Sequence, residues 1–251
     1  MRHGRMRAFY HVPVKQQPLF ITFVYSTEIF FSIQMNVVRS AGSGGRRSSL
    51  KFQNENPSAK QLVRRPTCTI AELMGKTKFS KDEICHLYRT FKQDCPSGEV
   101  TKAHFASVFA TLFPSGECFR YSVFLFRNID RTNSGFIRFE DLLVTLSLLV
   151  HGSIEERIGW IFDLYDLNKD GMLTRLELLQ MVAAIFQLIV PVCKLNFTSI
   201  TSAIEERTNQ LFEIWDMHGD GHVYKEDFLR YCLQNETIRK SMEMLKSNIC
   251  S

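Results

Sequence analysis

The sequence lacks the residue patterns on which most enzymes depend. It contains neither a glycine loop of the kind that cradles phosphates nor a motif for an activated nucleophile. It also lacks strand-like alternation of hydrophobic and polar residues over any useful length, which argues against a fold built on a large sheet. We therefore expect an all-α protein that is not an enzyme.

The cysteines do not form the pattern of a disulfide framework. They number seven, which is odd, and their spacing is not that of a metal site. Reduced thiols in a cytosolic setting explain them better than disulfides in a secreted protein.

One segment of twelve residues matches an EF-hand calcium loop at every constrained position. Calcium is a hard cation that takes six to eight oxygen ligands, and this loop offers oxygens at the required spacing. An ordinary turn rich in Asp and Asn would not require Leu173 at position eight or Glu177 at position twelve. The predicted ligands are Asp166, Asn168, Asp170, Met172 through its backbone carbonyl, Thr174 through a water, and Glu177, with Gly171 at the turn.

A second loop of this kind starts at Asp216 but departs from the pattern at two positions. Position three carries His218 in place of Asp or Asn, and position twelve carries Asp227, whose side chain is shorter than that of Glu. We therefore expect a weaker calcium site. Its candidate ligands are Asp216, His218, Asp220, His222 and Asp227.

Two earlier segments are less complete. The loop at 130–141 has only two charged ligands and carries Arg138 at position nine, so we expect it to be weak or to prefer Mg²⁺. The segment at 93–104 is broken by Pro96 and has no acid at position twelve, so we expect no metal there. The candidate residues of the 130–141 loop are Asp130, Thr132, Ser134 and Asp141.

The four segments begin at residues 93, 130, 166 and 216, a pitch of 37, 36 and 50 residues that is typical of helix-loop-helix repeats. Ser80 and Glu83 form a capping-box pattern before the first helix. Short loop residues should pair between hands, and the connection at 188–199 reads as irregular. Hydrophobic periodicity predicts helices at 119–129, 139–150, 155–165, 175–188, 201–215, 225–233 and 236–246.

These elements divide the chain into two EF-hand pairs, at 79–150 and 151–251, after a variable N-terminal extension at 1–78. The extension holds 13 Lys and Arg against 3 Asp and Glu, a net charge of +10, while the remaining residues sum to −5. A basic extension favours contact with anionic membrane, with an acidic protein surface or with nucleic acid. Low complexity around residues 40–45 favours a mostly disordered extension instead.

An apolar segment at 19–38 interrupts the basic extension. It fits the core of a signal peptide, a membrane-inserting segment or a helix that fills a groove, although Glu28 argues against a bilayer span. A start of the chain at Met35 is a fourth possibility. The residues alone do not separate these alternatives.

The residues from Leu87 to Gly98 resemble the disabled first hand of the neuronal calcium sensor family, in which a Cys-Pro pair interrupts the loop. Within that family the chain is similar to the Kv channel-interacting proteins, the calsenilin-like subgroup, over about residues 63–250. The blocks that carry this similarity are Phe124-Leu-Phe126, Phe139-Glu-Asp141, Leu146-Ser-Leu-Leu149 and Leu164-Tyr-Asp-Leu-Asn-Lys-Asp-Gly171.

This resemblance implies four EF-hands in two pairs, calcium as the ligand, and a fold like calmodulin or recoverin. The implied function is a calcium-sensing subunit at the cytosolic face of the plasma membrane. It would bind the cytoplasmic N-terminus of an A-type voltage-gated potassium channel and modulate its gating or trafficking, with no small-molecule substrate. A calcium-dependent regulator of another membrane enzyme or receptor, and a calcium-responsive regulator that binds nucleic acid, are the alternatives.

In sensors of this kind an amphipathic target helix lies in an apolar groove between helices. Five residues at helical positions are candidates to line such a groove, although each is also a candidate for the core: Phe105, Phe109, Phe124, Leu143 and Leu146. The resemblance further implies that the final helix occupies or gates the groove through Ile238, Met242 and Leu245.

Overall fold

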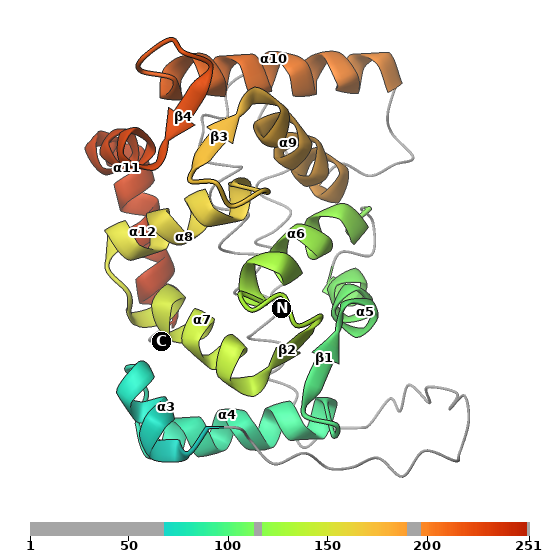
Figure 1. Cartoon of the computed structure of the whole chain (residues 1–251), viewed down its shortest axis with the longest axis vertical. Coiled ribbons are helices and arrows are strands. Elements are labelled where there is room, and N and C mark those ends of the chain that lie inside the picture. Colours follow the sequence, from blue (N-terminus) through green and yellow to red (C-terminus); the bar gives the residue numbers. More distant parts are fainter. Residues whose placement is uncertain (1–67, 113–116, 190–196, 250–251) are drawn as a thin grey trace.

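The computed structural model describes residues 68–112, 117–189 and 197–249, and within them the architecture is all-α (Figure 1). Expectations for the extension before residue 68, including its apolar segment and its disorder, lie outside the described residues. The first half contains α3 (Ile70–Lys76), α4 (Lys81–Asp94), β1 (Glu99–Thr101), α5 (Lys102–Leu112), α6 (Phe119–Ile129), β2 (Phe136–Arg138) and α7 (Phe139–His151).

The second half repeats this order of helix, short strand and helix. It contains α8 (Ile154–Tyr165), β3 (Met172–Thr174), α9 (Arg175–Ile189), α10 (Phe197–Trp215), β4 (His222–Tyr224), α11 (Lys225–Gln234) and α12 (Glu236–Ile249). Within each half the two loops pair through an antiparallel two-stranded ladder, β1 with β2 and β3 with β4. Val100 faces Ile137 in one ladder and Leu173 faces Val223 in the other. The four hands therefore form two pairs, as the sequence predicts.

Most of the predicted helices lie within one residue of their expected bounds. Two differences stand out. Helix α10 begins at Phe197, four residues before the predicted start, so part of the connection at 188–199 is helical. Helix α3 lies inside the segment assigned to the extension, because Thr69 and Glu72 cap it reciprocally and Leu73 is buried. Lys78 then ties this segment to α7, donating from its backbone N–H to Ser147 at 2.9 Å.

One continuous hydrophobic core runs through both halves, so the two pairs pack on each other as well as within themselves. Figure 1 shows the first pair below and the second pair above, with α12 running from α11 toward α7 along one side. Ile238 and Met242 of α12 are buried, and the Arg157 guanidinium of α8 holds this helix by donating to the Met242 carbonyl at 2.9 Å. The second Arg157 donor binds the carbonyl of Gly152 between α7 and α8, also at 2.9 Å.

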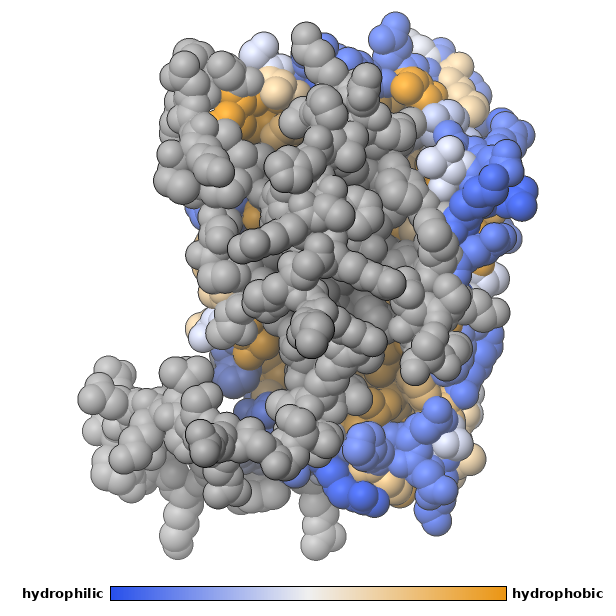
Figure 2. Space-filling model, turned by 180° about the vertical axis from the view of Figure 1, so that it is seen from behind, coloured by the Kyte–Doolittle hydropathy of each residue, from blue (hydrophilic) through white to orange (hydrophobic). Residues whose placement is uncertain are grey.

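Polar and apolar residues share the surface. Figure 2, seen from behind the view of Figure 1, shows hydrophilic residues along the right-hand edge and hydrophobic ones in the lower part of the face. The most exposed large hydrophobic side chains of the described residues are Phe119 on α6 and Leu176 on α9. None of the described helices combines the length and the apolar character that a bilayer crossing requires.

Gly152 is required where the two pairs join. A Cβ built on it meets the backbone carbonyl of Leu148, which already accepts the Gly152 N–H. We expect Gly152→Ala to lower the free energy of unfolding by about 1–3 kcal/mol, the usual cost of overpacking. Chemical denaturation measures this. The matched control is Gly75→Ala in α3, where the added Cβ meets nothing within 4 Å; equal stability of the two variants would contradict the expectation.

Candidate functional site: four EF-hand loops

The third loop has the backbone of an EF-hand loop at its sharpest turn. Asp166 follows α8 directly, and its carboxylate accepts the backbone N–H groups of Lys169 at 2.6 Å and Gly171 at 2.9 Å. Lys169 and Gly171 have φ of 64° and 86°, the left-handed region that glycine adopts readily and other residues adopt rarely. Asp166 is thereby held at the centre of the loop as the first ligand.

Positions three and five turn toward each other across the loop. The Asn168 amide nitrogen donates to Asp170 Oδ2 at 2.8 Å, and Asn168 Oδ1 accepts the Asp170 N–H at 2.9 Å. The other Asp170 oxygen accepts the N–H of Met172 at 2.9 Å. The side chains at positions three and five thus bind each other and the loop backbone.

Glu177, the ligand expected to bind with both oxygens, closes the loop through hydrogen bonds. Its Oε1 accepts the N–H groups of Leu167 and Asn168, each at 3.2 Å. Its Oε2 accepts the N–H of Thr174 at 2.9 Å and the hydroxyl of Thr174 at 2.7 Å. Among the described residues no three His, Cys, Asp or Glu side chains converge closely enough to hold a metal as they stand. Calcium binding would therefore exchange these Glu177 hydrogen bonds for the ion.

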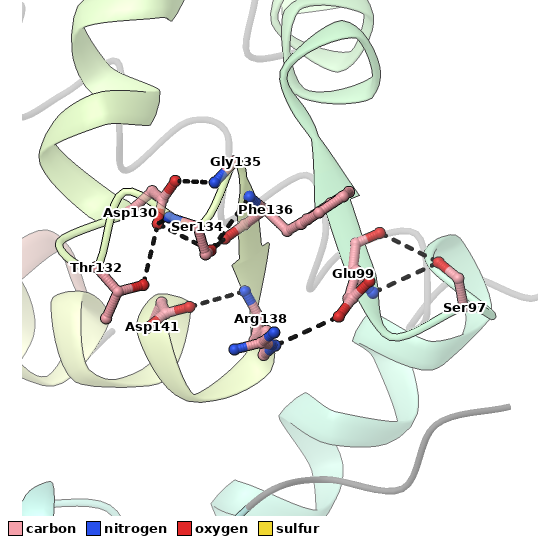
Figure 3. Close-up of polar contacts among 9 residues, drawn as sticks. All are labelled: Ser97, Glu99, Asp130, Thr132, Ser134, Gly135, Phe136, Arg138 and Asp141. Atoms are coloured by element: carbon pink, nitrogen blue, oxygen red, sulfur yellow. Dashed lines mark hydrogen bonds and ion pairs between the residues drawn. The ribbon is translucent and has the colours of Figure 1, made fainter.

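The second loop folds into the same shape with its own donors (Figure 3). Asp130 Oδ1 accepts the N–H of Ser134 at 2.9 Å and the hydroxyls of Ser134 and Thr132 at 3.1 and 3.3 Å. Asp141 accepts the N–H of Arg138 at 2.9 Å, and burial raises the pKa of the Asp141 carboxyl. Because Asp130 and Asp141 are the only acids at the loop's predicted ligand positions, we still expect a weak site here.

The side chain of Arg138 turns away from its own loop, toward the first hand. Its Nε lies 3.4 Å from Glu99 Oε1 on the neighbouring strand (Figure 3). The first loop keeps this ladder although it lacks a metal-binding pattern. Cys95 and His104 stand at its positions three and twelve, 3.6 Å apart between sulfur and Nε2. Burial raises the pKa of the Cys95 thiol to about 11, so this thiol is protonated at neutral pH.

In the fourth loop the two residues that depart from the EF-hand pattern, His218 and Asp227, contact each other. Asp216 accepts the N–H groups of Gly219 and Gly221, at 2.7 and 3.0 Å, as the first aspartate of an EF-hand should. At position twelve, however, Asp227 already contacts two side chains of this chain. His218 Nε2 lies 3.0 Å from one Asp227 oxygen, and Arg230 Nη1 lies 3.2 Å from the other.

Arg230 was not among the predicted site residues. It lies three residues after Asp227 on α11, a spacing at which side chains meet on a helix, so its contact was readable from the sequence. The remaining predicted side chains of this loop behave differently. Asp220 accepts the hydroxyl of Tyr224 at 2.9 Å, a bond that lowers the pKa of the Asp220 carboxyl, and His222 contributes its backbone to the β3–β4 ladder.

The five candidate groove residues lie in the first EF-hand pair. Phe105 and Phe109 of α5 stack at 6.2 Å between ring centroids, and both are buried. Leu143 and Leu146 of α7 are buried as well, while Phe124 of α6 is partly buried against the core. All five therefore contribute to packing in this structure, and their role in a groove stays a prediction. The five cysteines of the described residues carry free thiols.

Comparison with known proteins agrees with this geometry. Residues 155–233, from α8 to α11, match the family model of an EF-hand domain pair. Human recoverin is 34% identical over 122 residues, which are 49% of this chain and 61% of recoverin. The chain thus spans about three fifths of the length of that relative.

The loops and the matched pair are those of EF-hand proteins. An EF-hand domain pair implies calcium binding.

We expect the third loop to be the tightest site, with a dissociation constant of about 10⁻⁷–10⁻⁵ M. Glu177→Gln should weaken it by more than about 100-fold, since loss of a direct ligand exceeds the 10–100-fold typical of outer contacts. Calorimetric titration of the metal-free chain measures this. An unchanged tightest site in the variant would show that Glu177 is not a ligand.

The fourth loop should bind calcium more tightly once the contact between His218 and Asp227 is removed. His218→Asn frees one Asp227 oxygen and places an amide oxygen at position three, so we expect an increase in affinity on the order of tenfold. The control is His222→Asn, because position seven offers only its backbone carbonyl. Calorimetry should separate the two variants; the same fourth-site affinity in both would rule out competition by His218.

Proposed function

We propose that this chain is a calcium-sensing regulatory subunit that binds the cytoplasmic N-terminus of an A-type voltage-gated potassium channel. The observation that carries the calcium part is the third loop, where six ligand positions are occupied by suitable groups and held in EF-hand geometry. The channel part is supported by the similarity of this chain's residue blocks to the Kv channel-interacting proteins.

The mechanism follows from the position of Glu177 in the first turn of α9. In the structure described, its carboxylate joins this turn to the beginning of the loop. Calcium held by both Glu177 oxygens would replace these hydrogen bonds, and the start of α9 would then be tied to the ion rather than to the Leu167 and Asn168 N–H groups. Helix α9 packs on α10 and on α6, so a movement of this helix would reach both EF-hand pairs.

The proposed partner is an amphipathic helix of the channel. Sensor EF-hand pairs expose an apolar groove when calcium binds, and such a groove accepts the apolar face of a target helix. In this proposal the groove opens in the first pair, and α12 regulates access to it. Helix α12 packs on α7 and α8 through Ile238 and Met242, which places it beside the first pair. The site of action would then be the cytosolic face of the plasma membrane, and the basic extension would contact anionic lipid there.

Phe124 offers the sharpest test of this partner surface, because it is the least buried of the five candidates. A charge at Phe109 would disrupt the core, whereas Phe124→Glu leaves the most buried rings in place. We expect Phe124→Glu to weaken binding of a channel N-terminal peptide by about tenfold or more, the loss of one buried aromatic anchor. Fluorescence anisotropy with saturating calcium measures this.

The matched control is Phe119→Glu, on the same helix but 63% exposed. Equal peptide affinity in the two variants would contradict the proposed groove. Pull-down from membranes with and without calcium then tests the partner itself. Capture of a potassium channel supports the proposal, and capture of a membrane enzyme in its place favours the alternative regulator. Removal of residues 236–251 should alter peptide affinity and leave third-loop calcium affinity unchanged.

A further inference from the structure

Two residues at the end of α6, in the first EF-hand pair, touch the third calcium loop directly. Arg127 Nη1 donates to the backbone carbonyl of Leu167 at 3.1 Å. Asn128 accepts the ammonium of Lys169 on its Oδ1 at 2.9 Å. The same amide donates through Nδ2 to the carbonyl of Trp160 on α8 at 3.3 Å. These contacts cross from one EF-hand pair to the other, where α6 lies beside the third hand (Figure 1).

The two loop residues contacted from α6 are among those whose backbone N–H groups bind the predicted ligand carboxylates. Leu167, bound by Arg127 through its carbonyl, donates its N–H to Glu177. Lys169, bound by Asn128 through its side chain, donates its N–H to Asp166. Each α6 residue therefore reaches a predicted ligand through one intermediate loop residue. The two ligands reached are Glu177 at position twelve and Asp166 at position one.

Burial makes the Asn128 contact specific. Asn128 is only 5% exposed, and its amide uses both its oxygen and its nitrogen on the third hand. Lys169 also donates to the Asp163 carbonyl, and burial lowers the pKa of this lysine while Asp163 and Asp166 oppose the shift. The buried Asn128 amide holds this arrangement, because loss of the Lys169 contact would leave its oxygen without this charged donor.

We infer that Arg127 and Asn128 are positioning residues for calcium at the third loop, so that the first EF-hand pair sets the calcium affinity of the second. This inference rests on the proposed calcium binding at that loop. Neither residue reaches the ion. Arg127 holds the loop backbone at Leu167 and Asn128 holds the side chain of Lys169, so both support the loop conformation that aims Asp166 and Glu177, a role that outer contacts commonly have at metal sites.

A purely electrostatic role predicts the opposite sign of effect. The Arg127 guanidinium is a positive charge beside a cation site, so its removal would tighten calcium binding if charge alone mattered. Positioning predicts that the same removal weakens binding. Asn128 is neutral, and its truncation changes no charge. The two substitutions together therefore separate positioning from repulsion.

The test is calorimetric titration of the full chain with calcium. We expect Asn128→Ala to weaken the third site by about tenfold, within the range typical of such contacts, with the fourth site unaffected. The matched control is Ser122→Ala, also buried on α6, whose hydroxyl bonds only to the Phe119 carbonyl of its own helix. Equal third-site affinity in Asn128→Ala and Ser122→Ala would overturn the inference.

Arg127→Met provides the second measurement, with Arg120→Met as its control. Both residues are exposed arginines of α6, so both variants should fold even if Asn128→Ala does not. Weaker third-site binding in Arg127→Met than in Arg120→Met supports positioning, and equal or tighter binding overturns it. Absence of calcium binding at the third loop of the parent chain would refute the proposed function, a result distinct from any difference between variants.

Discussion

The arrangement of the molecule depends on one carboxylate that spans a calcium loop. Glu177 lies in the first turn of α9, yet its oxygens are bound at the other end of the loop, by the N–H groups of Leu167 and Asn168. The carboxylate therefore fixes where α9 begins relative to α8. A calcium ion competes for the same oxygens, so the ion and the direction of α9 are linked through a single side chain.

The four loops have similar backbone conformations but differ in the contacts that their side chains make at a few positions. Each has a glycine with positive φ at its turn, and each contributes one three-residue strand to a two-stranded ladder. In the third loop the predicted ligands Asp166 and Glu177 accept backbone N–H groups of the loop, whereas Asp227 of the fourth is paired with His218 and Arg230. In the second loop Asp130 accepts the hydroxyls of Thr132 and Ser134. The first loop carries Cys95 and His104 at positions three and twelve. One scaffold thus supports loops that differ in affinity while all four contribute to folding.

Much of this was predictable from the sequence, because the determinants are local. The glycine turns, the ligand spacing and the capping boxes each involve residues within one loop or one helical turn. Contacts between distant segments could not be read in this way. Asn128 and Lys169 are 41 residues apart, and nothing in either local pattern indicates that they meet. The early start of α10 at Phe197 is different, because Asn196 directly before it is a preferred N-cap residue type, so the sequence did carry a local signal that the predicted start at residue 201 missed.

The central claim is that calcium acts through the third loop by drawing Glu177 away from the loop's N–H groups. An NMR titration that follows the amides of Leu167, Asn168 and Gly171 tests it most directly. The account predicts a saturable shift of all three below about 10⁻⁵ M calcium, with faster amide exchange at Leu167 and Asn168 as their Glu177 bonds are lost. Unchanged third-loop amides while Gly221 of the fourth loop shifts would contradict the account.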